Sequence, residues 1–431
     1  MTPELATVVV LLGFLAMLAW GFVVPIAILI PAIAYLLIDS GWSAMNSLGF
    51  LVWGTLNNPT LTAVPLFILM AEILMASGLS TRVYRGLDVL VGRIPGGLLQ
   101  TNIAGCAVFS SVCGSSVATA AAIGRIALPQ LARRNYDPAL SAGSLAAGGT
   151  LGILIPPSIA LILYSTFTNT SVPTLFLGSL LPGLILAGLF MIYIALHTLV
   201  RGSGGVRSER PTPSQVIAAV GDVVPFFLLI GGTLGSLYAG WATTTEAATI
   251  GCVFALVLGF AYRGLSLSRL RTALLQTIWV SGSIMFIVVG AFIFASATSF
   301  AGINSVIGDF FGGLDLGKWQ FVGVIFAVFI VMGTFVESIA MMVIIVPIVF
   351  PLLANYGIDP VVFGVITVLF IELALITPPM GLSLFIIQGI SQGRLSDVMR
   401  GVVPFALIIV LFAVVLVAWP QLVLWLPDLL R

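Results

Sequence analysis

Two proline pairs, Pro156-Pro157 and Pro378-Pro379, stand inside hydrophobic stretches of this 431-residue chain. Proline lacks a backbone N–H and clashes with the preceding helical turn, so each pair would interrupt a helix and free several carbonyl oxygens. Free backbone at membrane depth is tolerated only where it is buried in protein or lines a cavity. Carbonyl and hydroxyl oxygens suit Na⁺, and the N-termini of interrupted helices attract anions. The two pairs therefore predict two ion sites beside one substrate cavity.

Both proline pairs belong to a longer pattern that occurs twice, with the second copy 222 positions after the first and no gap between. Two copies of a proline-broken, Gly/Ser-bearing unit in a hydrophobic chain indicate a secondary transporter with an internal repeat. The matching residues are Ser116-Val117-Ala118, Pro129, Asp137-Pro138 and Pro156-Pro157 in the first copy, and Ser338-Ile339-Ala340, Pro351, Asp359-Pro360 and Pro378-Pro379 in the second.

A helical hairpin is expected before each proline pair. Residues 97–132 have arginines beyond both ends and a polar break at Ser110–Ser116, which is typical of a segment that enters a membrane and leaves on the same, cytoplasmic side. Residues 317–354 break at Gly333–Ser338 without a flanking basic cluster, so this hairpin is expected to enter from outside. Hairpins entering from opposite faces make the repeat inverted, which suits alternating access. The broken helices that follow are expected at residues 138–170 and 358–390.

The composition is that of a membrane protein. Hydrophobic residues make up 60% of the chain and charged residues 7%, whereas soluble domains carry about 25% charged residues. Apolar runs such as 216–238 and 401–424 reach the ~20 residues that a span needs. We therefore expect an all-α polytopic membrane protein. The formal net charge of +1 gives no reason to expect nucleic acid as a partner, and the three cysteines lack metal-ligand spacing. No organic cofactor is expected.

The arginine clusters and the first residues bear on topology. Met1-Thr2-Pro3-Glu4 lacks the basic start of a signal peptide, so the first hydrophobic segment is expected to be a retained span. Arginine clusters mark the cytoplasmic side, and both termini are then expected in the periplasm. The expected parts are a scaffold at 1–60 and 171–262, transport-domain halves at 61–170 and 263–392, and a C-terminal span at 393–431.

At its most specific motifs the chain resembles the large membrane subunit of the tripartite ATP-independent periplasmic (TRAP) transporters. The resemblance implies an elevator-type carrier of organic anions such as C4-dicarboxylates, 2-oxo acids or sugar acids. It also implies Na⁺ coupling, a small four-helix membrane subunit, a periplasmic substrate-binding protein, and a bacterial or archaeal inner membrane. The stretches that carry it are Pro65–Leu69, Gly114–Ala120, Gly152–Ser158, Thr245–Ala248 and Leu375–Gly381.

The resemblance also implies ion ligands, largely backbone carbonyls at the hairpin tips and helix breaks. Cys113 stands where the family often has serine, and Ala374 replaces a common glycine. The implied ligands are Ser110, Cys113, Gly152, Ile155 and Pro157 for one Na⁺ site, and Gly333, Ala374, Thr377 and Met380 for the other.

Residues near the same breaks are candidates for substrate contact. Several have an alternative role. Membrane serines also donate hydrogen bonds to carbonyls of their own helix. Glu337 could instead cap a helix or bind a proton, and the Arg125 side chain could instead extend toward the membrane interface. Glu72 is interpreted as a structural residue. The candidate substrate-binding residues are Ser115, Ser116, Arg125, Gly149, Thr150, Glu337, Ser338 and Pro378.

The tripartite carrier has three alternatives: a stand-alone carrier, an intramembrane enzyme and a channel. A stand-alone elevator-type anion carrier would need neither a binding protein nor a small subunit. An intramembrane enzyme is disfavoured because the chain has one histidine and no nucleophile–base motif. A channel is disfavoured because oppositely entering hairpins suit alternating access better than a continuous pore.

Overall fold

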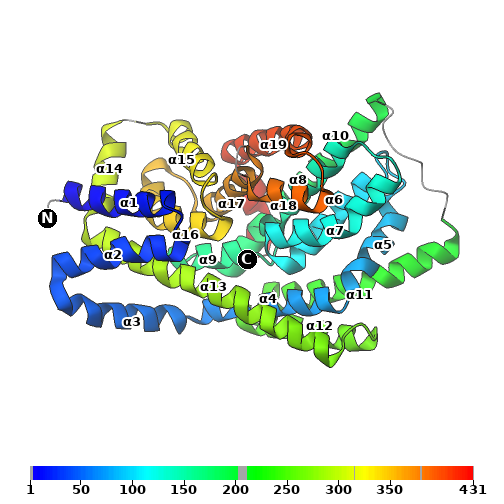
Figure 1. Cartoon of the computed structure of the whole chain (residues 1–431), viewed down its shortest axis with the longest axis horizontal. Helices are drawn as coiled ribbons and strands as arrows, with labels where there is room; N and C mark the ends of the chain where they lie inside the picture. The colour runs from blue at the N-terminus through cyan, green and yellow to red at the C-terminus, as the bar shows by residue number, and fades with distance from the viewer. Residues whose placement is uncertain (1–2, 202–210, 315, 379–380, 431) are drawn as a thin grey trace.

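The computed structural model describes residues 3–201, 211–314, 316–378 and 381–430, and in this part of the chain every regular element is a helix (Figure 1). The expected all-α fold, with two helical hairpins and two broken helices, is confirmed. The elements are α1 (Pro3–Ala19), α2 (Val24–Ser40), η1 (Gly41–Ser43), α3 (Ala44–Leu56), α4 (Pro59–Ala76), α5 (Leu79–Val91), α6 (Leu98–Cys113), α7 (Ser116–Arg133), α8 (Pro138–Leu154), α9 (Ile159–Thr168), α10 (Val172–Arg201), α11 (Pro213–Tyr238), α12 (Thr244–Ala261), α13 (Leu267–Phe300), α14 (Ile303–Gly313), α15 (Lys318–Met332), α16 (Ser338–Val349), η2 (Phe350–Tyr356), α17 (Pro360–Ile376), α18 (Leu382–Ser391), α19 (Leu395–Ala418) and α20 (Gln421–Leu429).

Matching residues start and stop the two broken helices. The side chains of Asp137 and Asp359 accept hydrogen bonds from backbone N–H groups of the first turn, and a proline follows each at the first helical position. These are the preferred residues for a helix start. Helices α8 and α17 end before the two proline pairs, where no intrahelical N–H is available. The hairpins α6–α7 and α15–α16 precede them, as the sequence predicts.

The repeat extends well beyond the matching motifs. Each of α6 to α10 begins within two residues of a helix 222 positions later, and α8 and α17 correspond residue for residue. The halves differ at one place, where the first has two separate helices and the second has one continuous helix. Asn58 caps α4 by accepting a 2.8 Å bond from the Thr60 N–H, and Pro59 follows it. The equivalent positions in the second half are Val280 and Ser281, so α13 continues unbroken where α3 and α4 separate.

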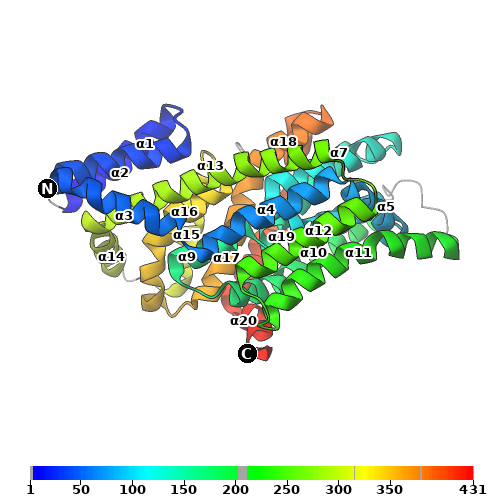
Figure 2. The ribbon, with the colours of Figure 1, turned by 90° about the horizontal axis from the view of Figure 1, so that it is seen from below.

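The two halves are interlocked, because contacts between them recur with the halves exchanged. Helix α2 packs on α13 and α12 packs on α4; α7 packs on α18 and α16 packs on α9. Helix α13 also runs beside α3 and α4, as Figure 2 shows. This exchange is what a two-fold relation between the halves requires.

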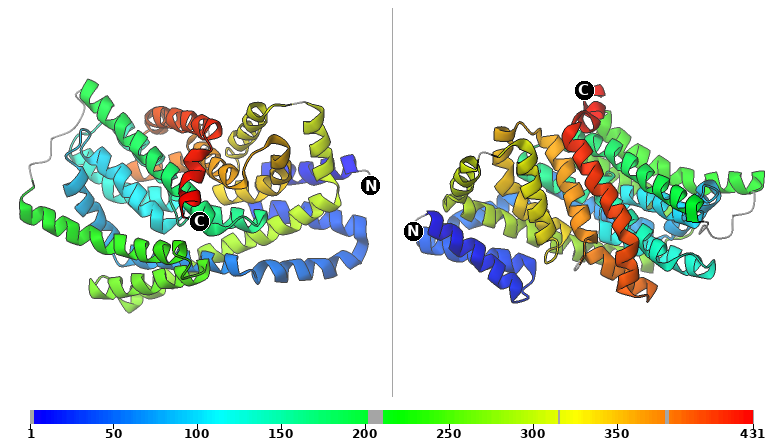
Figure 3. Two further views of the ribbon diagram at one scale, coloured as in Figure 1. Left: turned by 180° about the vertical axis from the view of Figure 1, so that it is seen from behind. Right: turned by 90° about the horizontal axis from the view of Figure 1, so that it is seen from above.

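The contacts divide the helices into two groups. Helices α1–α4 and α11–α13 are linked by contacts, and α2–α4 with α11–α13 form a layer along the lower side of Figure 1. The first hairpin and both broken helices pack with α10 or α19, and α20 lies against α10 (Figure 3). The second hairpin packs on α17 and α9, and its helix α16 also contacts α13. The segment Pro138–Thr168 is buried throughout its most apolar window, whereas α11 and α12 are buried over only 28% and 33% of theirs. Eight helical segments of the described residues are long and apolar enough to cross a bilayer.

Candidate functional site

The tip of the first hairpin lies directly against the first helix break. Gly114, with φ +59°, makes the turn between α6 and α7, and the Ser115 side chain then caps α7 by accepting from the Ala118 N–H. A Cβ added at Gly114 would lie 3.1 Å from the Pro157 carbonyl oxygen, and one added at Gly152 would lie 2.7 Å from that of Ser115. Glycine at both positions therefore allows the backbone of the hairpin tip and the backbone of the helix break to pack closely together.

Three predicted substrate residues fasten this hairpin to α8. The buried Ser116 hydroxyl donates to the Thr150 carbonyl oxygen at 3.4 Å, and the Thr150 hydroxyl donates to Ala147. Gly149 is buried against Ala120, whose Cβ would lie 2.5 Å from an added Cβ. These contacts indicate that Ser116, Gly149 and Thr150 hold the hairpin in place.

The ligands expected for the first ion site gather at this junction. The buried Ser110 hydroxyl donates to the Cys106 carbonyl at 2.5 Å, which leaves its oxygen lone pairs as acceptors. Cys113 is buried at the end of α6. Ile155 ends α8 in an extended conformation, and its N–H donates to Leu151. Their role as Na⁺ ligands stays a prediction.

The second hairpin meets the second break in the same way. A Cβ added at Gly333 would overlap the Ala374 side chain, so these two residues touch. Thr377, at the position equivalent to Ile155, is likewise extended after its helix, and its hydroxyl donates to the Leu373 carbonyl at 2.6 Å. Pro378 is partly exposed. Met380 lies outside the described residues.

A cavity of about 440 Å³ lies between the two hairpin tips and the helices α4 and α13. It brings together Ser115 and Cys113 of the first tip with Glu337 and Ser338 of the second. It does not include Arg125, which is exposed on α7. The other lining residues are Ile68, Ala71, Glu72, Met75, Val117, Ala118, Ala121, Ile159, Gln276, Trp279, Val280, Ser283, Ile284, Ile287, Ile339 and Leu382.

Four helices begin at this cavity. The first residues of α9 and α18, Ile159 and Leu382, line it, and so do the first turns of α7 and α16. Helix N-termini carry partial positive charge and unpaired N–H groups that attract anions. Among the described residues no arginine, lysine or histidine lines the cavity, whereas Glu72 and Glu337 do. An anion bound there would therefore be held by helix termini and hydroxyl groups.

Sequence reasoning missed part of this lining. Glu72 lies on α4, and Gln276, Trp279 and Ser283 share one face of α13 at helical spacing. An acid inside an apolar helix is itself a signal of function. Glutamine and serine on α13 give no comparable signal, because only packing against the hairpin tips brings them to the cavity.

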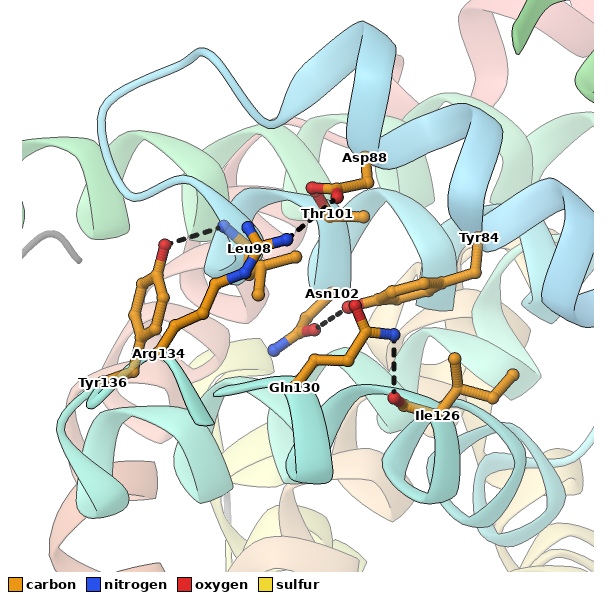
Figure 4. A network of polar contacts seen from close by, with 9 residues as sticks. All are labelled: Tyr84, Asp88, Leu98, Thr101, Asn102, Ile126, Gln130, Arg134 and Tyr136. Carbon is orange, nitrogen blue, oxygen red and sulfur yellow. Dashed lines mark hydrogen bonds and ion pairs between the residues drawn. The ribbon is translucent and has the colours of Figure 1, made fainter. Parts of the chain in front are cut away.

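A polar network ties the amphipathic helix α5 to the first hairpin (Figure 4). The Tyr84 hydroxyl donates to Asn102 at 2.8 Å, and Asp88 pairs with Arg134 at 3.9 Å while accepting from the Thr101 hydroxyl at 3.4 Å. Burial raises the pKa of the Asp88 carboxyl above its ordinary value, although Arg134 and Thr101 act in the opposite direction. On its other side α5 packs on α11, where Arg82 lies 3.7 Å from Asp222.

The repeat, the paired breaks and the cavity between the hairpin tips are those of a multi-pass membrane transporter of the permease class rather than an enzyme. Residues 11–422 match the family model described as "Tripartite ATP-independent periplasmic transporter, DctM component". The chain belongs to this family, as its large membrane subunit.

Similar permeases carry names that agree with this assignment, and a solved transporter shares the fold. The C4-dicarboxylate TRAP transporter large permease protein of Pseudomonas aeruginosa is 34% identical over 89% of this chain and 90% of its own length. The sialic acid large permease of Vibrio cholerae is 28% identical over 97% of both chains. The YdaH transporter of Alcanivorax borkumensis shares the fold, with a TM-score of 0.64 over 90% of each chain at 17% identity.

Proposed function

We propose that the chain carries small organic carboxylates inward together with Na⁺. The observation that supports this most directly is the cavity, on which four helix N-termini converge beside two carbonyl-bearing helix breaks. Helix N-termini bind carboxylates without any basic side chain. Similar permeases carry the names of C4-dicarboxylate, sialic acid and isethionate transporters, all acids.

Sodium binding at the two breaks explains how an anion enters a cavity that contains two glutamates. Where either glutamate is ionised it repels a substrate carboxylate, and a bound Na⁺ would compensate that charge. The first Na⁺ site would use Ser110, Cys113, Gly152, Ile155 and Pro157, and the second Gly333, Ala374, Thr377 and Met380. Both sites then lie where a hairpin tip contacts a break, so ion binding fixes the tip that closes the cavity.

Movement of one helix group against the other would give alternating access by an elevator mechanism. The proposed moving body is the first hairpin and both broken helices with α10 and α19, joined by the second hairpin through α17 and α9, and α1–α4 with α11–α13 form a frame. Helices α5 and α14 connect frame and body in the two halves. This division differs from the predicted parts, because it moves α10 and α19 into the body and assigns α4 and α13, within the predicted halves at 61–170 and 263–392, to the frame.

The carrier would work with two partners in a bacterial or archaeal inner membrane, with both termini in the periplasm. The apolar residues that α11 and α12 expose, including Ile217, Phe227, Val253 and Val257, offer a surface to lipid or to a small four-helix subunit. A periplasmic binding protein would deliver the substrate. One relative is named a DctMQ permease, and this chain covers 64% of it.

Uptake of labelled organic acids into proteoliposomes tests the proposal. The liposomes would contain this chain with its small subunit, with and without a Na⁺ gradient and the matching binding protein. Uptake that requires both supports the tripartite sodium-coupled carrier. Equal uptake by this chain alone, without binding protein, would overturn it in favour of the stand-alone carrier.

Thr377→Val adds a site-specific readout. Removing the hydroxyl is expected to raise the Na⁺ concentration for half-maximal uptake about tenfold. Thr272→Val is the matched control, because the Thr272 hydroxyl makes the same bond to its own helix, to Ser268 at 3.1 Å, away from the cavity.

A further inference from the structure

A second cavity of about 230 Å³ lies away from the transport site, where the turn between α7 and α8 meets the turn between α18 and α19. Its polar side chains are Tyr136, Ser141, Ser391, Arg394 and Asp397. The exposed Arg133 lies on the same turn. Arginines at a helix end mark the membrane–water boundary.

Four donors in this cavity suit a phosphate group. Arg394 precedes α19, and no side chain caps this 24-residue helix, so its first N–H groups are open to an acceptor. The Tyr136 hydroxyl accepts from the Leu98 N–H at 3.2 Å, so its own proton is available to donate. The Ser141 hydroxyl is buried, with the side chain 3% exposed, and has no hydrogen-bond partner among the described residues.

The Ser141 hydroxyl is the strongest observation in favour of a ligand site here. A buried polar group without a partner costs about 1–3 kcal/mol, and most buried polar groups in native structures have a hydrogen-bond partner, so a donor left over at a cavity wall suits a bound acceptor. The equivalent positions in the second repeat are Ile358 and Phe363 in place of Tyr136 and Ser141. The repeat fold therefore does not itself require these two hydroxyls.

The rest of the lining points to a lipid as the source of the phosphate. The walls are apolar and come from Leu128, Leu131, Ala142, Ile390 and Val398. A free phosphate ion gains nothing from such walls, whereas the glycerol and first methylenes of a phospholipid bury apolar area against them. Asp397 adds a carboxylate, which disfavours a purely anionic headgroup and suits an ammonium group.

We propose that this cavity binds the headgroup of phosphatidylethanolamine, with the phosphate at Arg394, Tyr136, Ser141 and the start of α19, and the ammonium at Asp397. The bound lipid joins α7–α8 of the first repeat to α18–α19 of the second. This site is independent of the transported substrate and of Na⁺.

Native mass spectrometry of the purified complex of this chain with its small subunit tests the site. Dioleoyl-phosphatidylethanolamine and dioleoyl-phosphatidylglycerol would be added back separately after delipidation. The ethanolamine lipid is expected to bind more tightly. Arg394→Gln is expected to weaken it about tenfold and Ser141→Ala about fivefold, since each removes donors to the phosphate. Asp397→Asn is expected to abolish the preference for ethanolamine.

Arg400→Gln is the matched control, because Arg400 is exposed on the same helix and lies outside the cavity. Equal binding by Arg394→Gln and Arg400→Gln would overturn the proposal. So would displacement of the lipid by millimolar inorganic phosphate, which would identify a free-phosphate site. Thermal unfolding of each delipidated variant shows that the fold is intact.

Discussion

Hydroxyl groups at the proposed ion sites are already engaged as donors to their own helices. Ser110 donates to Cys106, and Thr377 donates to Leu373. Their protons are therefore directed away, and their lone pairs are left for a cation. Cys113 differs, because sulfur is a soft ligand and Na⁺ is a hard cation. Cys113 lines the cavity, where an oxygen ligand would bind Na⁺ more tightly than its sulfur.

Cys113→Ser is accordingly expected to increase sodium affinity. The added hydroxyl supplies a hard oxygen ligand, and the Na⁺ concentration for half-maximal uptake should fall about three- to tenfold. Sodium titration of uptake in proteoliposomes measures this. Cys106→Ser is the control, because Cys106 is also buried on α6 but does not line the cavity. Identical curves for the two variants would mean that Cys113 is not a ligand.

Glu372 occupies the position in α17 that Thr150 has in α8. Its side chain is 0% exposed, and neither carboxyl oxygen has a hydrogen-bond partner among the described residues. Because an apolar side chain of similar volume removes this buried polar group, Glu372→Met is expected to stabilise the protein by about 1–3 kcal/mol. Thermal unfolding in detergent measures it. A lower melting temperature than the wild type would instead indicate that Glu372 has a bound partner.

Local sequence patterns located the site better than they sorted its residues. Ser115, Glu337 and Ser338 line the cavity as predicted for substrate contact, whereas Ser116 and Thr150 bond to the hairpin and helix backbone. All of these residues lie close to the breaks. Which side of a helix faces the cavity depends on contacts between segments far apart in sequence. That information is absent from a motif, so the sequence does not predict that Glu72 lines the cavity.

The glycines at the two breaks set how closely a hairpin approaches its broken helix. Gly152→Ala would place a Cβ 2.7 Å from the Ser115 carbonyl oxygen and push the tip away. Overpacking of this kind costs about 1–3 kcal/mol, and uptake should fall strongly because both the ion site and the cavity involve this tip. Gly188→Ala on α10 meets open space and should be neutral or slightly stabilising. Comparable uptake by the two variants would contradict this account.

The link between α5 and the first hairpin gives a pH-dependent prediction. Helix α5 lies outside the segments able to cross a bilayer, and burial raises the pKa of Asp88. The folded protein therefore binds the Asp88 proton more tightly than the unfolded chain, so this group's contribution to stability falls as pH rises through that raised pKa. Asp88→Asn removes the dependence while it keeps an acceptor for Thr101.

Melting temperatures at acidic and alkaline pH measure the effect. Asp88→Asn should match the wild type at low pH and be slightly more stable at high pH, by less than about 1 kcal/mol because the carboxyl is partly exposed. Asp222→Asn, at the other ion pair of α5, is the control. A loss of stability for Asp88→Asn at high pH would mean that the pair with Arg134 outweighs burial.

The broken helices were the easiest elements to predict, since proline, glycine and Asp-Pro starts mark their ends directly. The expected segments 138–170 and 358–390 compare with Pro138–Thr168 and Pro360–Ser391. The unbroken α13 was predictable for a similar reason, because no proline stands where Pro59 breaks the first copy. The packing partners of α10 and α19 could not be predicted from the sequence. Both helices are apolar on all sides, so long-range contacts decide which helices they pack against.

At the level of the whole molecule, the exchange of contacts between halves explains how one chain forms two helix groups, the proposed frame and the proposed moving body. Each half contributes helices to both groups, so neither half is a domain by itself. The cavity lies where the groups meet, with α4 and α13 on one side and the hairpin tips on the other. A relative movement of the groups would change which face of the membrane the tips open to.

Cross-linking distinguishes this movement from local opening of the hairpins. Phe167 on α9 and Phe292 on α13 stack at 4.4 Å across the boundary between the groups. Phe326 on α15 and Phe370 on α17 lie 5.1 Å apart within the moving body. Replacing either pair with cysteines allows a short thiol cross-linker to join them. The three native cysteines are buried, so the wild type treated with the cross-linker controls for reaction elsewhere.

The cross-link between Phe167→Cys and Phe292→Cys is expected to abolish uptake, because it ties the body to the frame. The cross-link between Phe326→Cys and Phe370→Cys should leave most uptake intact, because both residues would move together. A cleavable linker supplies a further control, since reduction should restore transport in the first pair. If the first cross-link left uptake unchanged while the second abolished it, access would be controlled by opening of the second hairpin within a fixed body, and the elevator mechanism would not apply.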